Sequence, residues 1–142
     1  MPVVELTTSA RDGYTVVALC GELDVTGVGD AEAAIAALAE RGQYLVLDMS
    51  ALDFLDCGSL GALRRVQGVA RRGGGDIVLA APHGLVLRLL TLTGSGEVFW
   101  VHASVTAAGA SIARRRRRYP WLRLAVRTAR SGRAVSSRTG TG

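Results

Sequence analysis

The residues most capable of chemistry in this sequence lie between positions 53 and 59, where two aspartates, a cysteine and a serine occur together. Asp56 stands before Cys57-Gly58-Ser59, a pattern that predicts a helix N-cap and its first turn. Cys57 would then lie beside the positive end of the helix, with Arg64 two turns further on, and could have thiolate character. A redox switch at Cys57 is one hypothesis. No second cysteine lies nearby in the sequence to resolve an oxidised thiol, so we interpret Cys57 as a tolerated small residue.

Four aspartates fall at or near the ends of predicted strands and could gather at one rim of a sheet. They are Asp24, Asp48, Asp53 and Asp56. Such a cluster could serve as a metal site or as an acid/base pair, but the sequence has no metal-ligand spacing. We therefore interpret these carboxylates as solvated strand-end residues and predict no metal site.

The remaining motifs do not favour an enzyme. His83 and His102 are isolated, and no nucleophile-elbow sequence marks a Ser-His-Asp arrangement. The run 73–75, Gly-Gly-Gly, lacks the Lys-Ser/Thr of a phosphate-binding loop and precedes a strand, so it is interpreted as a flexible turn. We predict no catalytic residue, no cofactor and no small-molecule substrate.

Short apolar segments alternate with helical patterns along the first 113 residues. Strands are predicted at 3–8, 14–20, 44–48, 76–80 and 98–101, the first two forming a hairpin. Helices are predicted at 30–40, 57–72, 85–92 and from Ser104 to 113. Strands that alternate with helices predict an α/β sheet.

Charge divides the chain into an acidic body and a basic extension. All 17 basic residues are arginines, and ten of them follow Ala113, where no acid occurs. The other seven face 12 acids, which gives residues 1–113 a formal charge of about −5. We predict one domain over 1–113 and an arginine-rich extension over 114–142 that is largely disordered after about residue 130.

The ends and the cysteines point to a soluble intracellular protein. The N-terminus has no basic segment followed by an apolar one, and Pro82, His83 and Arg88 interrupt the longest apolar stretch. A cytoplasmic location is therefore expected. Cys20, inside an apolar run, is expected to behave as a small hydrophobe, and two isolated cysteines give no disulfide framework.

Three motifs in this order resemble the STAS domain of bacterial anti-sigma-factor antagonists. They are Gly21-Glu22-Leu23-Asp24, then Asp56 with Leu60-Gly61, and finally Leu90-Thr91-Leu92-Thr93-Gly94. The resemblance covers roughly residues 3–113. It implies a mixed sheet of four or five strands packed against about four helices.

The resemblance also implies a function. Antagonists of this family bind an anti-sigma kinase and release a sigma factor, and the kinase inactivates them by phosphorylating a serine or threonine. Aligned without a gap, Asp56 matches the family aspartate, Gly58 the phosphorylated position and Ser59 the usual glycine. The partner-binding residues implied are Asp24, Asp56, Cys57, Gly58, Leu60, Gly61, Arg64 and Arg65.

A helical wheel separates the two positions at which a phosphate could be attached. With Cys57 at zero, Ser59 lies near 200°, in the middle of the apolar arc, whereas Gly58 lies near 100°, beside the polar face. A phosphate on an inward-facing serine would be costly to desolvate. We therefore predict that Ser59 is a locally satisfied core hydroxyl, with phosphorylation of Ser59 as the alternative.

The arginines at 114–118 give a second function hypothesis. A polybasic segment followed by Trp121 and Leu122 could contact an anionic membrane or a nucleic acid. The alternative to an anti-sigma-factor antagonist is therefore a non-enzymatic STAS scaffold or ligand-sensing module held by this basic tail. A solvated tail is the simpler interpretation.

Overall fold

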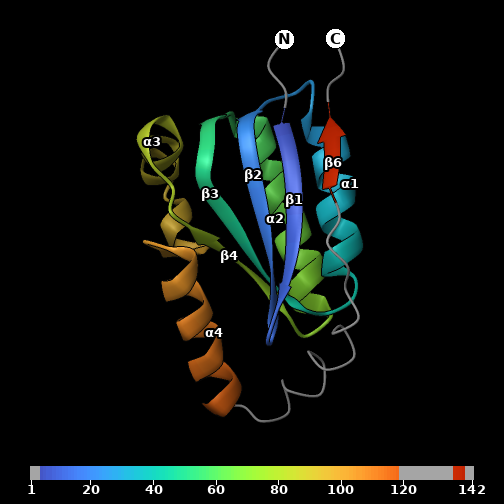
Figure 1. Cartoon of the computed structure of the whole chain (residues 1–142). Coiled ribbons are helices and arrows are strands. Elements are labelled where there is room, and N and C mark those ends of the chain that lie inside the picture. Colours follow the sequence, from blue (N-terminus) through green and yellow to red (C-terminus); the bar gives the residue numbers. More distant parts are fainter. Residues whose placement is uncertain (1–3, 119–135, 140–142) are drawn as a thin grey trace.

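The computed structural model describes residues 4–118 and 136–139, and its strands form one sheet with helices on both faces (Figure 1). The elements are β1 (Val4–Arg11), β2 (Tyr14–Leu23), α1 (Val28–Ala39), β3 (Tyr44–Leu55), α2 (Cys57–Arg72), β4 (Asp76–Ala80), α3 (Gly84–Leu92), the 3-10 helix η1 (Ser95–Glu97), β5 (Trp100–His102), α4 (Val105–Arg118) and β6 (Ser136–Thr139). The strand order is β5-β4-β3-β2-β1-β6. Strands β2 to β5 are parallel neighbours, whereas β1 pairs antiparallel with β2 and β6.

The predicted α/β domain, with a mixed sheet of four or five strands and about four helices, is confirmed: up to residue 118 the structure has five strands and four α-helices. The sheet also has a sixth strand, because the short β6 pairs with the outer edge of β1. The expectation that the extension is largely disordered after about residue 130 stays a prediction. The other residues of the tail lie outside the described part of the chain. No helix within 4–118 is long and apolar enough to cross a membrane.

The main core lies between the sheet and the helices α1, α2 and α3. In a strand, alternate side chains point to opposite faces, so Leu45 and Leu47 of β3 face these helices together with Leu79 of β4. Leu63 and Val66 of α2 pack on them. Each fully buried side chain of this size stabilises the fold by about 1.5–3 kcal/mol.

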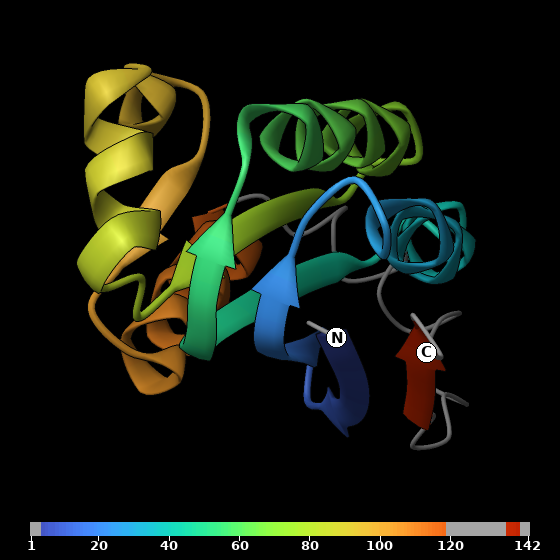
Figure 2. The same cartoon turned by 90° about the horizontal axis from the view of Figure 1, so that it is seen from above.

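Helix α4 covers the opposite face of β2, β3 and β4, as the view from above shows (Figure 2). It closes a second core, whose buried members are Val16, Tyr44, Val46, Val78, Ala80, Ala108 and Ile112. Gly109 lets α4 approach the sheet closely, because a Cβ there would meet the hydroxyl of Tyr14. Central strand β3 is thus buried on both faces along its first half, as parallel strands usually are.

The glycine-rich turn before β4 packs closely against the turn before β3. A Cβ on Gly75 would clash with the carbonyl oxygen of Gln43, and a Cβ on Gly42 would clash with that of Gly73. Gly42 also has a φ of +70°, which favours glycine. Sequence reasoning interpreted 73–75 as a flexible turn, but these glycines permit the contact between two backbones.

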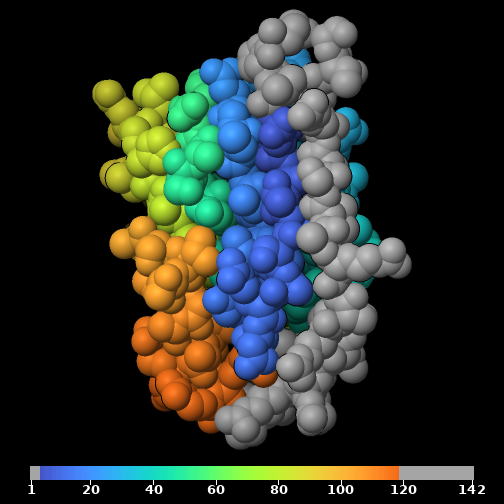
Figure 3. All heavy atoms as spheres, in the orientation of Figure 1, coloured from blue at the N-terminus to red at the C-terminus, as the bar shows by residue number. Residues whose placement is uncertain are grey.

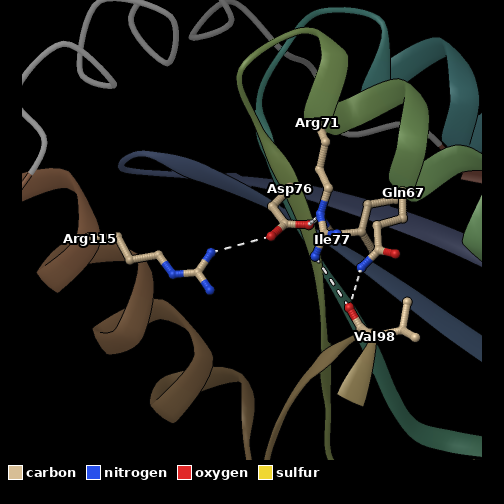
Figure 4. Close-up of polar contacts among 6 residues, drawn as sticks. All are labelled: Gln67, Arg71, Asp76, Ile77, Val98 and Arg115. Atoms are coloured by element: carbon tan, nitrogen blue, oxygen red, sulfur yellow. Dashed lines mark hydrogen bonds and ion pairs between the residues drawn. The ribbon is translucent and has the colours of Figure 1, made fainter. Parts of the chain in front are cut away.

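A buried carboxylate joins α2, β4 and α4 near this turn (Figure 4). Asp76 Oδ1 accepts hydrogen bonds from Arg71 Nε at 3.0 Å and from the backbone N–H of the next residue, Ile77, at 2.8 Å. Its other oxygen accepts one from Arg115 Nη1 at 3.3 Å. The Arg115 guanidinium also stacks on the Trp100 ring, 3.2 Å from its centroid. Asp76 therefore ties the start of β4 to helices on both faces of the sheet.

Several predicted element boundaries differ from the structure. Strand β3 continues past Asp48 to Leu55, because Met49, Leu52 and Leu55 remain buried while the residues between them are mostly exposed. A break in the β2–β3 register accommodates this irregular half of the strand. Strand β5, predicted at 98–101, begins two residues later, at Trp100.

Two further sequence expectations are corrected. Helix α4 ends at Arg118 and not at residue 113, so the arginine run continues the helix. Cys20 is exposed, because it lies on the face of β2 that α4 leaves uncovered beyond Ala18.

We expect Asp76→Ala to lower the free energy of unfolding by about 2–4 kcal/mol, since it leaves a half-buried guanidinium and a strand N–H without their acceptor. Chemical denaturation followed by circular dichroism measures the change. Asp53→Ala, at an exposed carboxylate, is the matched control and should stay within about 0.5 kcal/mol of the unaltered protein. Equal stability of the two variants would contradict the role given to Asp76.

Candidate functional site

The loops that follow β2 and β3 meet at one end of the sheet. The two strands are parallel and end in register, Leu23 opposite Leu55. The Asp56 N–H donates a hydrogen bond to the Leu23 carbonyl at 3.3 Å, which links the second loop to the first. The sequence motifs around Asp24 and Asp56 therefore belong to one surface.

Asp56 caps helix α2 as the sequence predicts. Its backbone is extended, with φ −94° and ψ 170°, and its Oδ1 accepts the Ser59 N–H at 2.7 Å. This bond satisfies one of the backbone donors left unpaired at a helix start. Asp56 is thus a structural cap whose carboxylate is only partly exposed.

Ser59 is fully buried, as the helical wheel predicts. Within the described part of the chain its Oγ has no hydrogen-bond partner, so the expectation of a locally satisfied hydroxyl is wrong. Gly58, by contrast, is exposed, and a Cβ placed on it would meet nothing nearer than Asp56 Oδ1 at 3.7 Å. Position 58 could therefore carry a side chain without rearrangement, but it has no hydroxyl.

The loop after β2 presents a charged and an apolar side chain together. Asp24 Oδ1 accepts the backbone N–H of Thr26 at 2.9 Å and its hydroxyl at 2.6 Å. These two bonds, the hydroxyl first, lower the pKa of Asp24 below its ordinary value. Val25, which lies between Asp24 and Thr26 in the sequence, is 75% exposed. The sequence analysis did not single out Val25. It could have been found as a β-branched apolar residue in a loop, outside the apolar patterns of the predicted strands and helices.

The outer face of α2 continues this surface. Cys57, Arg64 and Arg65 are exposed and Gly61 is partly exposed. Arg65 holds Glu32 of α1 by two hydrogen bonds, of 2.9 and 3.0 Å, and this contact lowers the pKa of Glu32. An ion pair this exposed contributes little stability, yet it fixes the orientation of both side chains.

One predicted partner-binding residue does not lie on the surface. Leu60 is only 4% exposed and belongs to the main core. The resemblance assigns Leu60 a partner-binding role from its position in the motif, whereas its packing in the core gives it a structural role. Of the residues that the resemblance predicts to bind a partner, those at least partly exposed are Asp24, Asp56, Cys57, Gly58, Gly61, Arg64 and Arg65, and the exposed Val25 lies next to Asp24 in the same loop.

The other candidates are placed apart from this surface. Among the described residues, no group of three or more His, Cys, Asp or Glu could hold a metal ion. Asp48 accepts the backbone N–H of Ser50, which is an ordinary local turn contact. His102 lies on β5, and burial, with Arg115 and Arg114 nearby, lowers its pKa, so its imidazole is neutral at pH 7.

Comparisons with known proteins agree on one family. The model of the STAS domain family matches residues 5–108. No curated protein sequence matches significantly. An anti-sigma factor antagonist from Mycobacterium paratuberculosis is similar, with 26% identity, a TM-score of 0.71 and coverage of 78% of this chain and 94% of that one.

Two further solved structures share the fold. The anti-sigma factor antagonist SpoIIAA in its unphosphorylated form has 20% identity, a TM-score of 0.65 and coverage of 76% and 96%. The murine anion transporter Slc26a9 has 23% identity and a TM-score of 0.64 over 74% of this chain, but only 18% of the transporter.

We expect the two polar residues at the start of α2 to differ in their effect on stability. Ser59→Ala removes a buried hydroxyl without a partner and should leave the free energy of unfolding unchanged or raise it by up to about 1 kcal/mol. Asp56→Ala removes the N-cap and should lower it by about 1 kcal/mol. Urea titrations of both variants give the values. Destabilisation by Ser59→Ala beyond about 1 kcal/mol would mean that the hydroxyl has a partner.

Proposed function

This chain belongs to the STAS domain family, and on that premise we propose that it is an anti-sigma-factor antagonist that binds a kinase-type anti-sigma factor and so releases a sigma factor. It acts by binding and not by catalysis. The similar protein from Mycobacterium paratuberculosis, described as an anti-sigma factor antagonist, is matched over nearly its whole length.

The observation that carries the proposal is the surface formed where the β2 and β3 loops meet. It joins the exposed start of α2 to the loop that displays Val25. An exposed apolar side chain with charged groups around it suits an interface with an anchor residue and a polar rim. We assign Val25 as the anchor, with Arg64 and the Asp24 carboxylate in the rim.

Binding by this chain is constitutive in our proposal. A phosphate would bring about −1.5 to −2 charges and would require solvent and a kinase to reach its hydroxyl. Ser59 is enclosed, and the exposed neighbouring position holds a glycine. Control by phosphorylation at the family position is therefore lost, while the surface that binds remains.

The alternative is a STAS module that serves as a scaffold or ligand-sensing unit. The likeness to part of an anion transporter shows that the same fold occurs in a protein of another kind. A pull-down from native lysate with the full chain distinguishes the antagonist function from this alternative. Recovery of a kinase-like anti-sigma factor favours the antagonist; recovery of other STAS proteins or anionic polymers favours the alternative.

We expect the unaltered chain, incubated with ATP and the kinase recovered in this way, to remain without phosphate. Gly58→Ser should become phosphorylated, because the position is exposed and has room for the side chain. Intact-mass and peptide mass spectrometry locate the phosphate. Stoichiometric phosphate on Ser59 of the unaltered chain, lost in Ser59→Ala, would refute the constitutive model.

We expect Val25→Asp to weaken binding to the anti-sigma factor by about tenfold or more, because it places a charge at the centre of the interface. Leu92→Asp is the matched control, since Leu92 is also 75% exposed but lies on α3. Isothermal titration calorimetry compares them. If both variants bind as the unaltered chain does, Val25 is no part of the interface.

A further inference from the structure

The end of the molecule opposite Asp24 and Asp56 is built from the β1–β2 turn and the C-terminal ends of α1, α2 and α4 (Figure 1). We call this surface the basic end. Its exposed charged residues include four arginines whose side chains form no ion pair or hydrogen bond in the described part of the chain: Arg11, Arg41, Arg72 and Arg117. Among the described residues, the exposed carboxylates of the basic end are those of Asp12 and Glu40.

Close contacts hold these segments together as one surface. The guanidinium of Arg116 lies against Gly13, and its Nη1 donates to the Asp12 carbonyl at 3.5 Å, which joins α4 to the β1–β2 turn. The backbone contact of Gly42 with Gly73 joins the ends of α1 and α2. The space-filling view shows the β1–β2 turn and α4 side by side (Figure 3). The arginines are thus displayed by a rigid part of the fold.

The positive charge exceeds what the helices themselves require. An arginine near a helix C-terminus offsets about half a negative charge from the helix dipole. Three such ends supply about −1.5 in total. The four exposed arginines and half-buried Arg116, set against two carboxylates, leave a surplus. Arg114, one turn earlier in α4, adds to it.

A hollow in this surface could receive an anion. It has a volume of about 290 Å³ and is lined by Asp12, Ala113, Arg116 and Arg117. Among the described residues, the buried Nε of Arg116 has no hydrogen-bond acceptor. Two arginines that line one hollow supply guanidinium donors, which form charge-assisted hydrogen bonds to phosphate oxygens. The negative charge of Asp12 at the edge of the hollow limits the affinity of this one site for an anion.

We propose that the basic end binds the phosphate backbone of nucleic acid without sequence specificity. A polyanion can contact all of these arginines at once and release counterions from each phosphate that they neutralise. The structure provides helix ends and turns here, not a helix or ribbon that could enter a groove. The contact is therefore to phosphates and not to bases.

A membrane surface fits this end less well. Interfacial membrane binding combines basic residues with apolar side chains that enter the lipid. The large exposed hydrophobic residues that the structure describes are Val25, Phe54, Leu85, Leu87, Leu92, Trp100 and Val101. None belongs to the β1–β2 turn or to the C-terminal ends of α1, α2 or α4.

The test measures binding of the full chain to a fluorescent 20-base-pair duplex at several salt concentrations. We expect Arg117→Glu to weaken binding equally for unrelated sequences and to reduce the slope of log affinity against log salt by about 0.9. The double variant Arg72→Glu/Arg117→Glu should reduce this slope by about twice as much. Arg88→Glu, an exposed arginine on α3 with the same change of charge, is the matched control and should leave the slope unchanged.

Three outcomes would overturn the proposal: no binding of the unaltered chain at low salt, an equal effect of Arg88→Glu and Arg117→Glu, or tighter binding to phosphatidylserine vesicles than to the duplex. Binding of the anti-sigma factor should be unaffected by Arg72→Glu/Arg117→Glu, since both residues lie far from Val25. A failure at the basic end is therefore distinguishable from a failure of the antagonist proposal.

Discussion

Parallel pairing of β2, β3, β4 and β5 is the constraint on which the rest of this structure depends. Parallel strands need cover on both faces, and here α1, α2 and α3 supply it on one side and α4 on the other. Parallel pairing also sends every strand-to-helix loop to the same end of the sheet and the C-termini of α1, α2 and α4 to the opposite end. The common direction of these strands therefore places the surface at Asp24 and Asp56 at one end of the sheet and the basic end at the other.

Much of this arrangement could be predicted from the sequence where local signals and packing agree. Helix α2 has the bounds that its N-cap and glycine stop indicate, Cys57–Arg72, and the inward position of Ser59 follows from helical periodicity. The α/β alternation gave the architecture. The N-cap of Asp56 needs only residues three positions apart, so no tertiary information is required.

What could not be predicted depends on contacts between distant residues. The second half of β3 contains Ser50 and Asp53, which interrupt its apolar pattern, and it remains a strand because β2 pairs with it. The arginine run looks like a solvated tail until Asp76 and Trp100 are seen beside Arg115. Leu60 and Val25 show the same limit at the candidate site, since a motif gives a position in the chain and not its exposure.

Gly58 has a consequence for how such a protein can change over evolutionary time. Its surroundings already fit a small side chain, and the cap beside it comes from Asp56 regardless of what position 58 holds. Glycine and serine codons can differ by a single base. A regulated and an unregulated form of this surface are therefore neighbours in sequence space, and a lineage could pass between them without an intermediate that fails to fold.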